Sequence, residues 1–144
     1  YYDIDLSKEL SLINQFIVSK GTMPQMAGTE ITDKAYMIKA QIGCIYEEEL
    51  YDFDIFTEYH GADRGKSILA HIGDVPNERN DMIVSIKAYL VEEHLGIKIN
   101  KTYTVTIDAK HNKYHVRRAR RRTSEVQRVL QDLIHNLIDQ YDKL

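Results

Sequence analysis

The sequence of 144 residues contains no tryptophan, two prolines and a single cysteine, Cys44. One cysteine excludes a disulfide within the chain, which favours a reducing, cytoplasmic location and a buried structural thiol. No apolar run reaches the roughly 18 residues that a membrane helix needs, so no membrane partner is expected. The N-terminus lacks the basic and apolar pattern of a signal peptide. It also starts with Tyr1 rather than methionine, which indicates a chain trimmed from a longer protein.

The composition that is present is typical of a folded globular protein, with 43% hydrophobic and 28% charged residues. The length matches one domain, so we expect a single compact domain over residues 1–144. A domain of this size buries about two-thirds of the surface of its unfolded chain, so it needs no metal or disulfide to fold. The sequence has no internal repeat and no low-complexity tract.

Apolar residues at helical spacing predict three helices. The first runs from Ser7 to Lys20, and the second from Asn77 to Leu95. The third begins at Ser124, whose side chain can cap the helix together with Gln127 in a capping box. The apolar stripe of this last helix is wide enough to pack on the domain and to form a seam with a second copy. A homodimer seam would consist of Leu130, Leu137, Tyr141 and Leu144.

Alternation of apolar and polar residues predicts the strands. Residues 35–59 fit two strands, although the first half also fits a helical period, and residues 67–72 fit a further short strand. A hairpin follows, with a turn at residues 110–113. On its return strand, alternation points Tyr114 and Val116 inward and His115 and Arg117 outward.

The predicted order of elements is therefore α–β–β–β–α–β–β–α. We expect an α+β fold in which an antiparallel or mixed sheet of about four to five strands packs against three helices.

The net charge of −3 hides a strong segregation of charge. Residues 47–63 include seven acidic side chains and no lysine or arginine, whereas residues 110–128 contain one acidic side chain, Glu125. The basic residues of the second stretch are Lys110, Lys113, Arg117, Arg118, Arg120, Arg121, Arg122 and Arg128. Asymmetry of this kind indicates an anionic partner.

The arginine-rich stretch lies between a strand and the start of a helix, where positive charge opposes the helix dipole. Phosphates would relieve this repulsion, and the planar guanidinium fork suits them. The sequence therefore predicts a non-enzymatic protein whose eight basic residues contact a DNA or RNA backbone. Neutralising about five phosphates would give a slope of about −4.5 in log affinity against log salt on duplex DNA. An accessory protein of a virus or mobile element would fit this description.

Three alternatives stay open. The arginines could form a solvated face that docks on the chain's own acidic segment, or they could bind an acidic protein surface in an assembly or inhibitor protein. Asp52 and Asp54 would share one face of a strand, as the ligands of a Mg²⁺- or Mn²⁺-dependent nuclease or phosphohydrolase do. Alternating aspartates are more often simply the wet face of a half-exposed strand. No other cofactor is expected.

Overall fold

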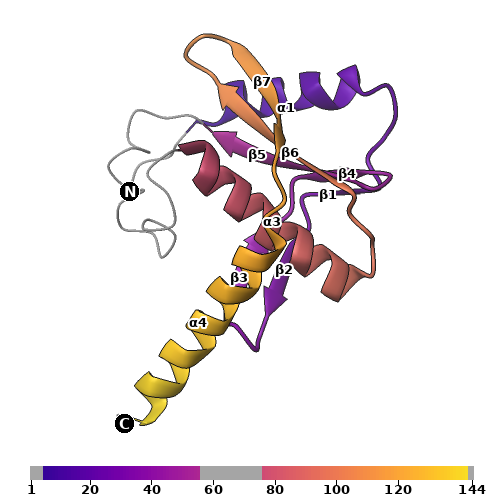
Figure 1. Cartoon of the computed structure of the whole chain (residues 1–144). Helices are drawn as coiled ribbons and strands as arrows, with labels where there is room; N and C mark the ends of the chain where they lie inside the picture. Colours follow the sequence, from indigo (N-terminus) through magenta and orange to yellow (C-terminus); the bar gives the residue numbers. More distant parts are fainter. Residues whose placement is uncertain (1–4, 56–75, 143–144) are drawn as a thin grey trace.

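The computed structural model describes residues 5–55 and 76–142 (Figure 1). Three helices and seven strands lie in these two stretches. In chain order they are α1 (Ser7–Ser19), β1 (Met26–Ala27), β2 (Glu30–Asp33), β3 (Ile38–Gln41), β4 (Cys44–Tyr46), β5 (Glu49–Ile55), α3 (Pro76–Leu95), β6 (Lys101–Asp108), β7 (Lys113–Ala119) and α4 (Thr123–Asp142). None of the helices in the described part of the chain is long and apolar enough to cross a membrane.

The main sheet has five strands in the order β1–β4–β5–β6–β7, and β2 and β3 pair in a second, two-stranded sheet. β5 and β6 are parallel and lie on either side of α3 in the sequence, while the other neighbouring pairs are antiparallel. The sheet is therefore mixed. The predicted α+β fold and the predicted order of elements are confirmed.

Helices cover both faces of the main sheet. On one face, Leu12 and Phe16 of α1 are buried against Tyr51, Val105 and Ile107 of the sheet. On the other face lies α3, which also contacts β2 and α4. Buried side chains therefore lie all around α3, and not only along the apolar spacing from which the helix was predicted. Its fully buried residues are Met82, Val84, Ala88, Leu90 and Val91.

Two details of the predicted strands differ from the structure. The first strand expected within residues 35–46 is divided into β3 and β4, which belong to different sheets. The division falls beside Gly43, where a Cβ atom would lie 2.1 Å from the carbonyl oxygen of Tyr51, so only glycine allows this approach. Neither β1 nor β2 was predicted. The strand predicted at residues 67–72 lies outside the described residues.

The last helix begins one residue earlier than predicted. The carbonyl oxygen of Arg122 accepts a hydrogen bond from the amide of Val126 at 3.0 Å, so Ser124 lies inside the first turn. The predicted cap at Ser124 is therefore wrong. The first half of α4 packs on the core through Val126 and Leu130, and the helix then extends away from the sheet (Figure 1).

Candidate nucleic-acid interface

The strand β7 divides the arginine-rich stretch between the two faces of the sheet. In the antiparallel register, Arg118 lies opposite Tyr103, and Arg117 lies opposite Thr104. Tyr103 packs on the α1 side of the sheet, so its neighbour Arg118 lies on that side as well. Because successive residues of a strand point to opposite faces, Arg117 lies on the α3 side.

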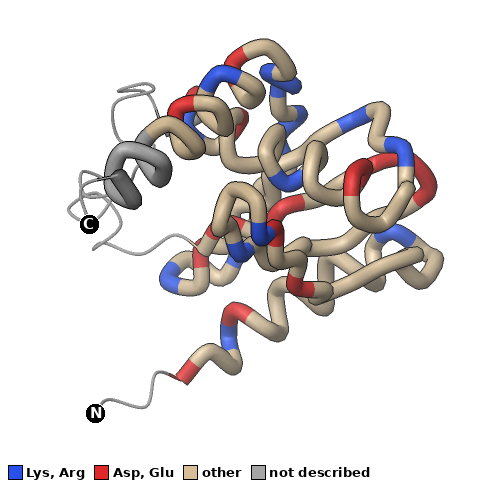
Figure 2. The backbone as a smooth tube through the Cα atoms, turned by 90° about the horizontal axis from the view of Figure 1, so that it is seen from below, with Lys and Arg blue, Asp and Glu red and all other residues tan. Residues whose placement is uncertain are grey.

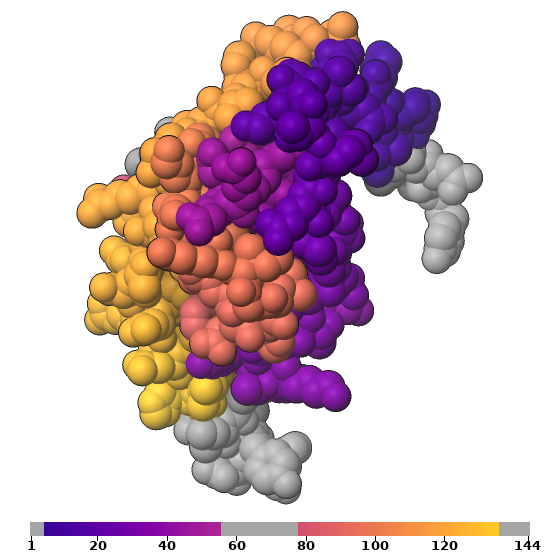
Figure 3. Space-filling view, turned by 90° about the vertical axis from the view of Figure 1, so that its right-hand side faces the viewer, coloured from indigo at the N-terminus to yellow at the C-terminus, as the bar shows by residue number. Residues whose placement is uncertain are grey.

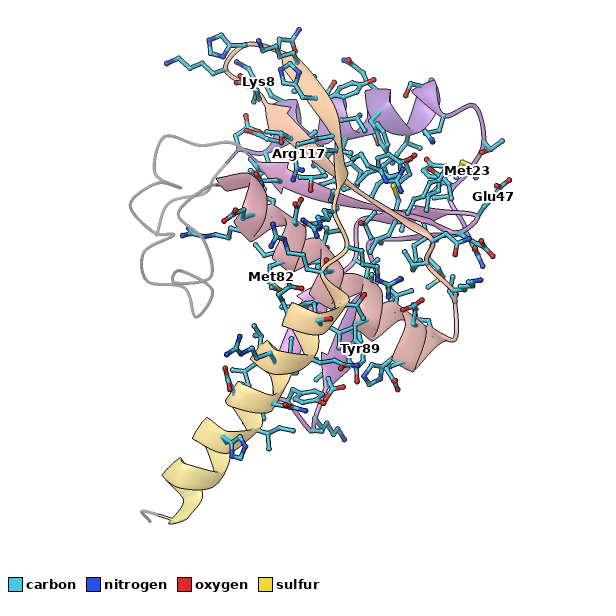
Figure 4. The ribbon with its side chains drawn as sticks, viewed as in Figure 1. Lys8, Met23, Glu47, Met82, Tyr89 and Arg117 are labelled. Atoms are coloured by element: carbon cyan, nitrogen blue, oxygen red, sulfur yellow. The ribbon has the colours of Figure 1, made fainter. Side chains whose placement is uncertain are left out.

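Arg117 forms an ion pair with α3. Its Nη2 atom donates a hydrogen bond to Oδ1 of Asp81 at 2.7 Å, and Asp81 is only 6% exposed (Figure 4). The prediction that Arg117 points outward is therefore wrong, because α3 covers the face toward which the strand directs it.

Two further arginines attach the segment after β7 to the domain. The guanidinium of Arg121 donates to the carboxylate of Glu92 on α3 and, at 2.6 Å, to the carbonyl oxygen of Ile99. Burial opposes the ionisation of Glu92, but hydrogen bonds from Arg121 and the Ile99 amide outweigh it and lower the pKa of Glu92. Arg122 donates its backbone amide to Ser85 Oγ at 2.9 Å, and its Nη1 atom lies 3.9 Å from the carboxylate of Glu125.

The polar partners on α3 share one face of that helix. Asp81, Ser85 and Glu92 follow each other at intervals of four and seven residues, close to one and two helical turns. Sequence reasoning missed this set, although the spacing was visible. Together these residues bind the segment that leads from β7 into α4. Arg117, Arg121 and Arg122 therefore have a structural role within the chain.

The other basic residues of the stretch point to solvent. All of them are exposed, and within the described part of the chain no carboxylate lies within salt-bridge distance of Arg118, Arg120 or Arg128. The exposed residues are Lys110, Lys113, Arg118, Arg120 and Arg128. Along the described backbone as a whole, acidic and basic residues are interspersed rather than gathered in two halves (Figure 2). Five exposed cations on the β6–β7 hairpin and the start of α4 form the candidate interface.

No known family model matches this chain, and a search of curated proteins finds no similar sequence.

The two aspartates of the metal hypothesis lie on the α3 side of β5. Asp52 is 7% exposed, and its Oδ1 atom accepts a hydrogen bond from Nζ of Lys87 at 2.6 Å. Burial raises the pKa of Asp52, and the nearby Lys87 ammonium acts against this shift. Asp54 accepts a weaker hydrogen bond from Asn80 at 3.4 Å. The interpretation of Asp52 as part of a wet strand face is wrong, because α3 covers it.

Among residues 5–55 and 76–142, no group of three or more histidine, cysteine, aspartate or glutamate side chains is placed to hold a metal ion. The acidic residues from Glu58 to Asp63 lie outside the described residues. The cysteine Cys44 is fully buried, as predicted, and burial raises its pKa to about 12.

Of the four residues in the candidate dimer seam on α4, only Leu130 has a side chain in the described part of the structure. Leu130 is 1% exposed and packs in the core of its own domain beside Val126. The side chains of Leu137 and Tyr141 and the whole of Leu144 lie outside the described residues. Leu130 therefore contributes to this domain's own packing.

Proposed function

We propose that this domain binds the backbone of a nucleic acid through the exposed cations of the candidate interface. The observation that supports the proposal is the contrast within one basic stretch. Arginines that face α3 each meet a carboxylate of the same chain, whereas Arg118, Arg120 and Arg128 meet none among the described residues. Phosphates would supply the missing counter-charge.

Protection of a sheet edge, a purely structural role, would explain only some of the exposed cations of the candidate interface. Lysine and arginine on an edge strand discourage pairing with other sheets, and β7 is the last strand of the main sheet. That explanation applies to Lys113 and Arg118. It does not apply to Arg120, which follows the strand, or to Arg128, which lies on α4.

The proposal predicts a moderate dependence on salt. If four of the cations each neutralise one phosphate, log affinity falls with log salt at a slope of about −3.6 on duplex DNA and about −2.8 on a single strand. Binding of this kind is independent of sequence, because backbone contacts carry no base information. A buried, unpaired cysteine and a nucleic-acid ligand both suit the cytoplasm, and an accessory protein of a virus or mobile element would fit.

A salt series of fluorescence anisotropy measurements tests the proposal. The test variant is Arg120→Ala with Arg128→Ala, and the matched control is Lys34→Ala with Lys98→Ala, which removes the same charge from exposed positions outside the interface. We expect the test variant to lose about 10-fold or more in affinity at about 0.1 M salt and to reduce the slope by about 2. The control should change neither quantity appreciably.

Equal losses in the two variants would show a non-specific charge effect and contradict the proposed interface. Absence of binding even at about 50 mM salt would contradict nucleic-acid binding altogether. If an acidic protein partner stays bound while excess oligonucleotide is ignored, the same cations serve a protein interface instead.

A further inference from the structure

Three neighbouring strands place two aromatic rings and a guanidinium side by side on the α1 side of the sheet. Tyr51 of β5 lies opposite Tyr103 of β6, and Tyr103 lies opposite Arg118 of β7. The two rings stack with centroids 4.7 Å apart and planes 9° apart. Cζ of Arg118 lies 5.8 Å from the centre of the Tyr103 ring, within cation–π range. The three side chains therefore form one column across the sheet.

The inner end of this column is closed. Tyr51 is 3% exposed, and Nζ of Lys20 lies 4.7 Å from its ring centre and 2.7 Å from its hydroxyl oxygen. The outer end is open, because β7 is the edge strand of the main sheet and Arg118 is exposed. The Arg118 guanidinium lies near Tyr103 and, because the residue is exposed, it is accessible to a ligand.

An apolar surface lies next to the open end. Val116 is on the same side of β7 as Arg118, two residues earlier, and is 47% exposed. Alternation predicted that Val116 points inward with Tyr114; it lies on the same side of the sheet as Tyr114, but it is not buried there. α1 reaches Tyr114, whose ring lies 5.9 Å from that of Phe16, but it leaves Val116 uncovered. Figure 3 shows α1 and the hairpin side by side at this end of the molecule.

An open guanidinium beside an apolar side chain favours a flat, electron-rich ring. A ring that stacks on Arg118 would extend the existing column by one layer, and Val116 would provide an apolar contact at its edge. Arg120 follows the end of β7, two residues after Arg118, and its exposed guanidinium is suited to hold a negatively charged group attached to such a ring.

We propose that an unpaired base of a single-stranded nucleic acid stacks on Arg118 and completes the column. This inference rests on the proposed function and names its ligand class. Unpaired bases stack on aromatic rings and on guanidinium planes, whereas the bases of a duplex already stack on each other and must be extruded to become accessible. The site therefore prefers single strands to duplexes, with little preference among bases.

The test compares two charge-preserving variants, Arg118→Lys within the column and, as the control, Lys34→Arg at an exposed position outside the interface. Lysine retains the positive charge but lacks the flat guanidinium. The probes are fluorescein-labelled oligothymidylate, oligouridylate and a mixed-sequence DNA duplex, each of about 20 units, which exceeds the usual site size of such domains. Circular dichroism of each variant verifies that the fold is retained.

We expect Arg118→Lys to weaken binding to both single strands about 10-fold and to change duplex binding less than about twofold. Lys34→Arg should change all three affinities less than about twofold, because Lys34 is exposed and lies outside the interface. Quenching of a 2-aminopurine base in the single strand should accompany wild-type binding and disappear in Arg118→Lys.

The stacking site is overturned if the wild type binds single strands and duplexes equally, if Arg118→Lys leaves both affinities unchanged and if no quenching is seen. The proposed backbone binding would then remain intact. If no probe binds at low salt, the proposed function fails and the stacking site fails with it.

Discussion

Replacing Lys87 by methionine should destabilise the domain by about 3 kcal/mol near neutral pH. The ammonium of Lys87 and the carboxylate of Asp52 are 2.6 Å apart, with side chains 19% and 10% exposed. Methionine retains most of the apolar volume of lysine, so the loss is mainly that of the charge. Removing one partner of a buried ion pair costs about 3–5 kcal/mol, and the low end applies because neither side chain is completely sealed from water.

The destabilisation should depend on pH. Burial already raises the pKa of Asp52 against the opposing effect of Lys87, and removal of Lys87 should raise it further. A carboxyl group with a raised folded-state pKa binds its proton more tightly in the native state. Its favourable contribution is therefore fully present in acid and is lost as the pH rises through the folded-state pKa. The cost of Lys87→Met should be greatest near neutral pH and smaller in acid.

Urea denaturation at about pH 7.5 and about pH 5 measures this difference, with Asp52→Asn and the double variant as controls. The double variant removes both charges and should recover most of the lost stability, giving a coupling of about 2 kcal/mol or more. The reasoning is refuted if Lys87→Met costs less than about 1 kcal/mol at both pH values. It is equally refuted if the double variant is as unstable as Lys87→Met alone.

Further predictions concern the backbone, the thiol and the metal hypothesis. Gly43→Ala should lower the melting temperature by several degrees in a thermal scan, because its Cβ would meet the carbonyl oxygen of Tyr51. Glu47 has a φ of 55°, so Glu47→Gly should raise the free energy of unfolding by up to about 1 kcal/mol in urea, and a loss would contradict the strain. Cys44, with its pKa raised to about 12, should resist a thiol reagent at about pH 8 in the folded protein and react in urea. Millimolar Mg²⁺ should leave the melting temperature unchanged, since Lys87 already neutralises Asp52; a rise that Asp52→Asn abolishes would support the metal site instead.

The helices and the hairpin were predictable because their signals are local. The helix predicted from Ser7 to Lys20 is observed over Ser7–Ser19, and the helix predicted from Asn77 is observed from Pro76. Each depends on a period of side chains within one segment and on flanking residues that end it. The turn between β6 and β7 follows from the same kind of local pattern.

The pairing of strands was not predictable, since it joins distant segments. β5 and β6 pair residue by residue from Glu49 with Lys101 to Ile55 with Ile107, although 52 positions separate the partners (101 − 49). Alternation within β5 shows two faces but does not say which strand lies beside it or in which direction. The close approach of Gly43 to β5, which separates β3 from β4, depends on the same distant pairing.

The arginine stretch shows how two local periods combine into a site. Glu125 is the only acidic residue close to the arginines in the sequence. Arg117 and Arg121 nevertheless pair with carboxylates that lie 36 and 29 positions away from them along the chain. Asp81 and Glu92 are about three helical turns apart, and strand alternation directs Arg117 toward the face that α3 covers. The same alternation directs Arg118 to the opposite face, where the described structure offers it a tyrosine ring and no carboxylate. The stretch therefore consists of arginines that attach β7 and α4 to α3 and of others whose charge is left for a ligand, and only the second group should respond to added polyanion.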